Sequence, residues 1–261
     1  VTKFDTQIEP PKYRDDMTAP PEALAVSVRS DLDNDTYQYE RQAYWDQPDP
    51  VVPLPFYGFN EYIAVTRHGF NTGGDHLEWL RKSHPETVAL RGRDKQFDHD
   101  YTVPQAIRTK VPEEHYSTSY IADRTVEWLE ARKGNPKPFI LMVSFPDPHH
   151  PFTPPGKYWD MYKPEDMEVP AAYNADDWDA PEYVKIAERA RAADPSLGQM
   201  SGYSVAISKE EALQARALTC GMISMIDDAV GRVREAATNA GVADKTVQIY
   251  TSDHGDHLGE H

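Results

Sequence analysis

Cysteine is almost missing from the sequence: Cys220 is the only one in 261 residues. No disulfide bond can therefore form within the chain. Cys220 lies in the apolar segment Ala-Leu-Thr-Cys-Gly-Met-Ile, whose spacing is typical of a helix. A cysteine in such a setting is expected to be a buried, unreactive thiol rather than a nucleophile.

Long apolar runs are also missing. The sequence has no stretch of 18 or more apolar residues, which excludes a membrane-spanning helix. No basic segment followed by an apolar one is visible at the start, so the cytoplasm is favoured as compartment. The compartment nevertheless stays open, because the sequence begins at Val1 without an initiator methionine and a targeting segment could lie upstream.

Positive charge is scarce. The chain has 27 Lys and Arg against 43 Asp and Glu, a formal net charge of −16. A polyanion such as DNA would be repelled by most of this surface, so nucleic acid is excluded as a partner. A small anion can still bind where a metal ion and a few cations converge. Apolar residues make up 39% of the chain, as expected for a soluble globular protein with a buried core.

Regular structure is not expected in the first part of the chain. Residues 1–60 are rich in proline and show no sustained hydrophobic period. Their many aromatic side chains indicate a segment that packs over a folded body: Tyr37, Tyr39, Tyr44, Trp45, Phe56 and Tyr57. The regular body is expected to span residues 61–261.

Hydrophobic periodicity predicts the elements of this body. Strands are predicted at 61–66, 139–145 and 246–252, the last two as continuous apolar runs of the kind that is buried on both faces. Helices are predicted at 76–82, 114–132 and 208–240; the last begins with the capping box Ser208-Lys-Glu-Glu211 and ends before Gly241. Residues 151–205 form a long excursion rich in proline and aspartate, which is typical of a functional loop or lid.

The order of helix, strand, long loop, helix and strand is typical of an α/β fold with a mostly parallel sheet. Ligands bind such sheets outside the carboxyl ends of the strands. Two predicted strands end in chemically rich segments, Pro146-Asp-Pro-His-His150 and Asp253-His-Gly-Asp256. The sequence therefore predicts an active site where these segments meet.

Carboxylates and imidazoles, the usual ligands of divalent cations, crowd the end of the chain. They are Asp253, His254, Asp256, His257, Glu260 and His261. Gly255 can break the strand so that Asp253 and His254 reach one ion, although a plain exposed loop has a similar composition. The H-x-x-E-H pattern at 257–261 resembles that of inverted zinc proteases, but Gly259 lies inside it, and we interpret it as a chance match.

Two adjacent histidines, His149 and His150, lie between Pro148 and Pro151. The prolines restrict the backbone and could hold an imidazole for proton donation or contact with an anion; a rigid turn without such a role is the simpler interpretation. The glycine-containing loop at 66–74 is interpreted as structural, since no ligand geometry can be derived from it.

Three segments, in this order, resemble the sulfatase family of the alkaline-phosphatase superfamily. Residues 138–155 resemble its strand followed by a PHxP loop, and residues 223–232 its long helix before the metal strand. Residues 251–261 resemble its TSDHGD-x-LGEH metal loop. The resemblance covers residues 110–261 well and the first hundred loosely.

The resemblance implies an alkaline-phosphatase-like α/β fold with one divalent cation, usually Ca²⁺, with Mn²⁺ and Mg²⁺ as alternatives. Asp253 and His254 match two of the metal ligands, and His149 matches the histidine that contacts the sulfate and assists the leaving oxygen. His150 occupies a variable position and receives no role. The expected substrate is a small sulfate ester; the oligomeric state stays open.

The sequence also departs from the family. The family's nucleophile is a formylglycine made in a C/S-x-P-x-R motif, which occurs nowhere in these 261 residues. The family's amino-terminal Asp pair and a lysine after the metal loop are missing as well. Residues 1–261 are therefore interpreted as an internal part of a sulfatase catalytic domain, inactive by itself.

The sequence is compatible with two alternatives. A phosphomonoester, phosphodiester or phosphonate monoester hydrolase of the same superfamily would share the metal loop and often the PHxP loop. A non-catalytic binding scaffold would explain the missing nucleophile, although the intact metal and histidine loops weigh against it.

Overall fold

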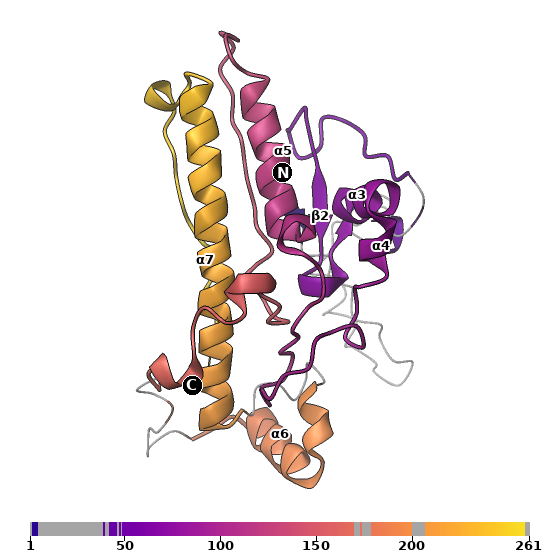
Figure 1. Cartoon of the computed structure of the whole chain (residues 1–261), viewed down its shortest axis with the longest axis vertical. Helices are drawn as coiled ribbons and strands as arrows, with labels where there is room; N and C mark the ends of the chain where they lie inside the picture. The colour runs from indigo at the N-terminus through magenta and orange to yellow at the C-terminus, as the bar shows by residue number, and fades with distance from the viewer. Residues whose placement is uncertain are drawn as a thin grey trace, which may run out of the picture.

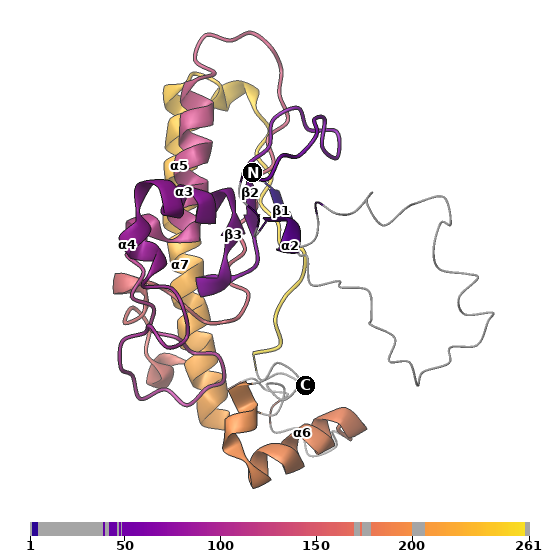
Figure 2. The same cartoon turned by 90° about the vertical axis from the view of Figure 1, so that its right-hand side faces the viewer.

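The computed structural model describes residues 2–4, 39, 42–45, 47, 49–169, 173, 179–199 and 207–258. Two long helices, α5 (Ser117–Glu130) and α7 (Lys209–Asn239), lie side by side. A small sheet and two short helices, α3 (Asp75–Ser83) and α4 (Pro85–Val88), lie on the side of α5 that faces away from α7 (Figure 1). The turned view in Figure 2 shows helix α6 (Glu182–Ala193) at the lower end of the molecule.

The described sheet has three short strands in the order β1-β2-β3. The central strand β2 (Ala64–Thr66) pairs in parallel with β1 (Thr2–Phe4) and antiparallel with β3 (Gly73–Gly74). All three residues of β2 are buried, which agrees with the strand predicted at 61–66, although the paired part is shorter. Its burial follows from packing against α5 through Val65, Tyr120 and Ile121.

Helix α3 contains the predicted helix 76–82 and is joined to its neighbours by buried polar groups. The Asp75 carboxylate accepts a hydrogen bond from the backbone N–H of Ala64 in β2, at 2.6 Å. Burial lowers the pKa of His76 to about 3, so that its ring is neutral. The His76 Nε2–H donates to the carbonyl of His115 at 3.0 Å, and Nδ1 accepts from the Thr72 hydroxyl at 3.0 Å. The bond to the His115 carbonyl ties α3 to the 3-10 turn η3 (Glu113–His115) that precedes α5.

The two long helices match the predictions at 114–132 and 208–240 to within three residues at each end. Leu129 of α5 packs against Ala236 and Ala237 of α7, where small side chains allow the helices to approach closely. An ion pair between Asp123 and Arg232 bridges them at the surface. None of the described helices is both long enough and apolar enough to cross a membrane.

The structure corrects the prediction of buried strands at 139–145 and 246–252. Both segments are extended, but neither pairs with a strand among the described residues. In the first, Phe139, Leu141, Val143 and Phe145 pack against the helices on alternate positions, while Ile140 is 86% exposed. In the second, the apolar side chains of Val247, Ile249 and Tyr250 are 86%, 84% and 77% exposed, so they are not part of the core. A strand becomes buried on both faces only inside a larger sheet, which the described residues do not form.

The long excursion at 151–205 differs from the prediction, and the first 60 residues lie largely outside the part of the chain that the structure describes. The excursion at 151–205 contains a twelve-residue helix, α6, that the sequence interpretation missed. Of residues 1–60, most lie outside the described residues, Tyr37 among them. Within the described part, aromatic rings do cluster: Trp45 is buried, and its indole N–H donates to the carbonyl of Tyr39 at 2.7 Å.

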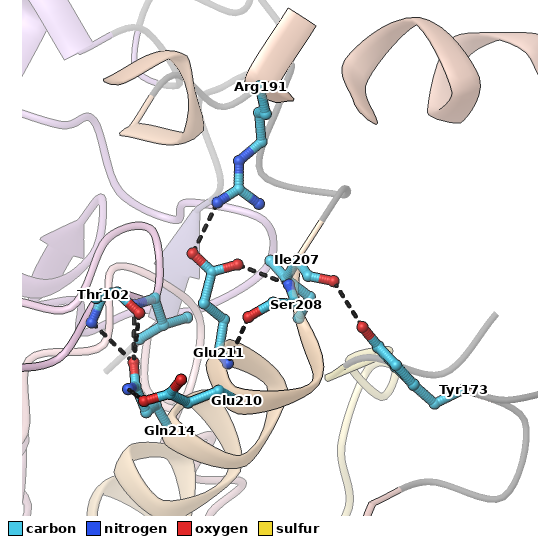
Figure 3. A network of polar contacts seen from close by, with 9 residues as sticks. Thr102, Tyr173, Arg191, Ile207, Ser208, Glu210, Glu211 and Gln214 are labelled. Carbon is cyan, nitrogen blue, oxygen red and sulfur yellow. Dashed lines mark hydrogen bonds and ion pairs between the residues drawn. The ribbon is translucent and has the colours of Figure 1, made fainter. Parts of the chain in front are cut away.

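A network of polar contacts surrounds the start of α7 (Figure 3). The predicted capping box is present: the Ser208 hydroxyl accepts from the Glu211 backbone N–H at 3.1 Å, and the Glu211 carboxylate accepts from the Ser208 N–H at 2.7 Å. The second carboxylate oxygen pairs with Arg191 of α6 at 2.7 Å. The two side chains of this pair are only 14% and 8% exposed, so water screens them little. The cap thus also attaches α6 to the body.

The double use of Glu211 leads to a first prediction. Ser208→Ala removes one capping bond and should cost about 1 kcal/mol of unfolding free energy. Glu211→Ala removes the other capping bond and leaves the poorly exposed charge of Arg191 without this partner, which should cost about 3 kcal/mol or more. Urea unfolding of both variants measures the difference. Equal losses would show that the Arg191–Glu211 pair adds nothing to stability.

Candidate active site

The segment Pro146–Pro151, here called the histidine loop, follows the extended residues 139–145 and contacts the first turn of α5 through Asp147 and Thr118. Phe152, directly after it, is fixed by two backbone bonds: its N–H donates to the Gln105 carbonyl, and its carbonyl accepts from the Ile107 N–H, both at 3.0 Å. The loop is therefore held at its carboxyl end by a neighbouring chain segment.

Asp147 anchors the middle of the histidine loop. Its side chain is buried and accepts from the Thr118 hydroxyl at 3.2 Å and from the Tyr116 hydroxyl at 3.4 Å. The Tyr116 oxygen also lies 2.7 Å from the hydroxyl of Thr153. Burial, reinforced by the Asp147 charge, raises the pKa of Tyr116 well above its ordinary value, so Tyr116 keeps its proton as a donor. The carboxylate also lies beside the first turn of α5, where the helix dipole favours negative charge.

The His149 ring lies face to face with the ring of His68, with centroids 3.7 Å apart and planes inclined by 9°. His68 is buried and comes from the loop at 66–74. Gly69 makes this approach feasible: a side chain there would come within 2.8 Å of Pro151 and 2.9 Å of Thr153, and the residue has a φ of +54°. The loop interpreted as merely structural thus forms one wall of the site.

His150 contacts the predicted metal loop. Its Nδ1 lies 3.9 Å from Oδ2 of Asp256. The proximity of His150, and next the backbone N–H of Leu258, lower the pKa of Asp256 against the opposing effect of its partial burial, so that it is held as a carboxylate. Leu258 packs against a buried cluster that includes Phe152 and Met222. The two segments predicted to form the site are therefore neighbours in space, although about a hundred residues separate them in the chain.

Asp253 and His254 themselves are largely exposed, at 74% and 70% of their side-chain surface. Asp253 Oδ2 lies 3.6 Å from His254 Nε2, and the His254 backbone N–H donates to Asp253 Oδ1 at 3.0 Å. Two ligands of one cation lie about this far apart, so the pair fits two positions of a coordination shell. Within the part of the chain that the structure describes, no third histidine, cysteine or carboxylate ligand joins this pair.

The other residues singled out in the sequence contribute less. His257 is exposed, and Glu260 and His261 lie outside the described residues. Cys220 lies in α7 and is half-buried rather than fully buried. The residues that the sequence interpretation missed are His68, Tyr116 and Thr118. Neither their spacing nor their type marks them, because each meets the histidine loop only through the tertiary fold.

Comparison with known proteins identifies the family. The sulfatase family matches residues 62–261. The chain belongs to the sulfatase family. Among curated relatives, the multifunctional alkaline phosphatase superfamily protein PehA of Trinickia caryophylli is 33% identical over 167 residues, 62% of this chain and 32% of its own length. An arylsulfatase of Clostridium perfringens is 30% identical over 187 residues, 72% of this chain and 35% of its own. The chain thus spans about a third of the length of these two relatives.

Solved structures confirm the fold class. A phosphonate monoester hydrolase of Agrobacterium radiobacter superposes with a TM-score of 0.53 and 25% identity, covering 82% of this chain and 44% of the other. A second such hydrolase, from Silicibacter pomeroyi, superposes with a TM-score of 0.50 and 21% identity, covering 79% and 40%. The fold is an incomplete α/β fold of the alkaline-phosphatase type. The family consists of hydrolases, and membership of it suggests that a divalent metal is bound.

The buried anchor of the histidine loop yields a second prediction. Tyr116→Phe removes one of the donors to Asp147 and the bond to Thr153, and should lower the unfolding free energy by about 1–3 kcal/mol. Tyr162→Phe is the matched control, since its hydroxyl bonds Ser224 in a partly exposed place where water can substitute. Thermal and urea unfolding measure both. If the control loses as much stability, the hydrogen bonds around Asp147 contribute no more to the unfolding free energy than a partly exposed hydroxyl pair does.

Proposed function

We propose that this chain provides the histidine loop and part of the metal site of a sulfate-ester hydrolase. The observation that carries the proposal is the contact between two segments distant in sequence, His150 of the histidine loop and Asp256 of the metal loop, 3.9 Å apart. Such a contact brings the loop with two imidazoles next to the loop that carries Asp253 and His254, which suits an ester anion bound between the two loops. Membership of the sulfatase family adds the substrate class.

In this proposal His149 assists the departing alcohol oxygen. Its Nδ1 bonds the carbonyl of His150, and because a carbonyl only accepts, Nδ1 carries a proton. Nε2 of the protonated ring would then donate to the leaving oxygen as the sulfur–oxygen bond breaks. Stacking on His68 restricts the rotation of the ring and supports a fixed direction of donation.

Asp253 and His254 would hold one divalent cation, most simply Ca²⁺, with Mn²⁺ or Mg²⁺ as alternatives. Such an ion, when bound, neutralises negative charge on the ester oxygens. The expected nucleophile is a formylglycine, and its C/S-x-P-x-R motif is not among these 261 residues. Activity is therefore tested in a protein that contains this chain together with that motif.

A second candidate, hydrolysis of phosphonate monoesters, is favoured by the two structural neighbours, which are named as such hydrolases. Rates on a nitrophenyl sulfate and on a phenyl phosphonate monoester, measured with the same preparation, separate the two. A non-catalytic scaffold would hydrolyse neither and would have no need of a tightly bound cation.

The third prediction concerns His149. In the active protein, His149→Ala should lower the catalytic rate by roughly 10²–10⁴-fold on esters of poorly acidic alcohols, because proton donation to the leaving oxygen is lost. The loss should shrink for nitrophenyl sulfate, whose oxygen departs without help. His150→Ala should have a smaller effect. Equal losses on both substrates would exclude leaving-group assistance, and unchanged rates with lowered thermal stability would make His149 structural.

The fourth prediction concerns Asp253. Asp253→Asn removes a negative charge that would balance the cation, so metal content and activity should fall together. Metal content is measured by elemental analysis after dialysis. Asp244→Asn, a change of the same kind in the exposed 3-10 turn after α7, is the control. Full metal content in Asp253→Asn would remove this residue from the proposed site.

A further inference from the structure

A second cluster of ligand-type side chains lies away from the histidine and metal loops, between α3, α4 and the turn before α5. It consists of His84, Glu86 and His115, here called the second cluster. One potential ligand atom from each residue lies within 4.8 Å of the others. His84 Nδ1 and Glu86 Oε1 are 3.6 Å apart, and the two imidazole centroids are 3.9 Å apart.

The backbone holds two of these residues in place. His84 lies between α3 and α4: its N–H donates to the Leu80 carbonyl at 2.8 Å, and its carbonyl accepts from the Thr87 N–H at 2.9 Å. Pro85 restricts the backbone at the start of α4, so Glu86 follows in a defined direction. The positions of His84 and Glu86 are thus set by local chain geometry.

The third residue arrives from a distant part of the chain. His115 ends the turn η3, and its ring Nδ1 lies 2.7 Å from the hydroxyl of Thr87, a residue that is 1% exposed. A hydroxyl partner on one ring nitrogen orients the imidazole and leaves Nε2 as the nitrogen for a metal, which is the usual arrangement around metal-binding histidines. Trp79 packs edge-on against His84 and His115, with centroids 4.7 and 5.8 Å away.

We propose that His84, Glu86 and His115 form a second divalent-metal site, selective for a transition metal of the Zn²⁺ type. Two imidazoles and one carboxylate suit Zn²⁺ and related ions, whereas Ca²⁺ and Mg²⁺ prefer shells of oxygen ligands. Ligands around a tetrahedral Zn²⁺ lie roughly 3.3 Å apart, given metal–ligand distances of about 2.0–2.2 Å. The 3.6 Å separation is close to this value, and the exposed Glu86 can move inward.

The site would join α4 to η3, and so to the start of α5, next to the anchor of the histidine loop. A fourth coordination position would face water, because Glu86 is 67% exposed and His84 29%. This inference is independent of the proposed function, since it uses none of the residues assigned to the ester site. The metal-binding measurement can therefore succeed or fail whatever the catalytic tests give.

The experiment measures Zn²⁺ binding to the chain by isothermal titration calorimetry, in an Asp253→Asn, His254→Ala background that removes the other candidate site. One equivalent of Zn²⁺ should bind, and a large excess of Ca²⁺ should not displace it. Glu86→Gln and His84→Ala should each weaken binding by more than about tenfold, and Thr87→Val, which removes only the hydroxyl that orients His115, by roughly 10–100-fold. Glu114→Gln, an exposed carboxylate beside the cluster, should leave binding unchanged.

Trp79 provides a readout of location. Titration with Cu²⁺ or Ni²⁺, which quench nearby indoles, should lower the tryptophan fluorescence, and Trp79→Phe should remove that change. Circular dichroism checks that each variant is folded, and the exposed Glu86→Gln keeps the test decisive if His84→Ala unfolds. Zn²⁺ binding that survives Glu86→Gln unweakened, or that disappears with His149→Ala instead, would overturn the proposal.

Discussion

The candidate site depends on the hydrogen bonds that the buried carboxylate of Asp147 accepts. This carboxylate lies under the first turn of α5 and accepts hydrogen bonds from Thr118 and Tyr116. A buried carboxylate without hydrogen-bond donors is costly, so the two hydroxyls at the start of α5 stabilise this course of the loop. His149 and His150 follow within three residues, so the hydrogen bonds of Asp147 also fix where these two histidines lie.

The framework behind the anchor is the pair of long helices. Helix α5 packs on β2 with Tyr120 and Ile121 and on α7 with Leu129, so it fixes the sheet and α7 relative to each other. Helix α7 in turn is fixed at its start by the capping box and by the ion pair of Glu211 with Arg191. The histidine loop, the metal loop and the second cluster all lie around this common support, near α5 or against side chains of α7.

Imidazoles are the recurring chemical element in an otherwise acidic chain. With a net charge of −16, the protein as a whole does not attract an anionic ester. The stacked rings of His68 and His149, the contact of His150 with Asp256, and the second cluster at His84 and His115 concentrate groups that can carry a proton or bind a metal. Local arrangement, rather than overall charge, therefore has to provide the attraction.

The sequence by itself determined the family, the bounds of α3, α5 and α7, the capping box and the two loops that meet, because periodicity, caps and short motifs are local properties. It also indicated Asp253, His254 and His149, whose roles stay predictions. It was wrong about the buried strands at 139–145 and 246–252, and it missed the helix at 182–193 within the long excursion. Apolar runs show that a segment can be covered, but only the tertiary structure decides what covers it. The same holds for His68 against His149 and for His115 beside His84: these rings meet through packing of distant segments, which no local pattern encodes.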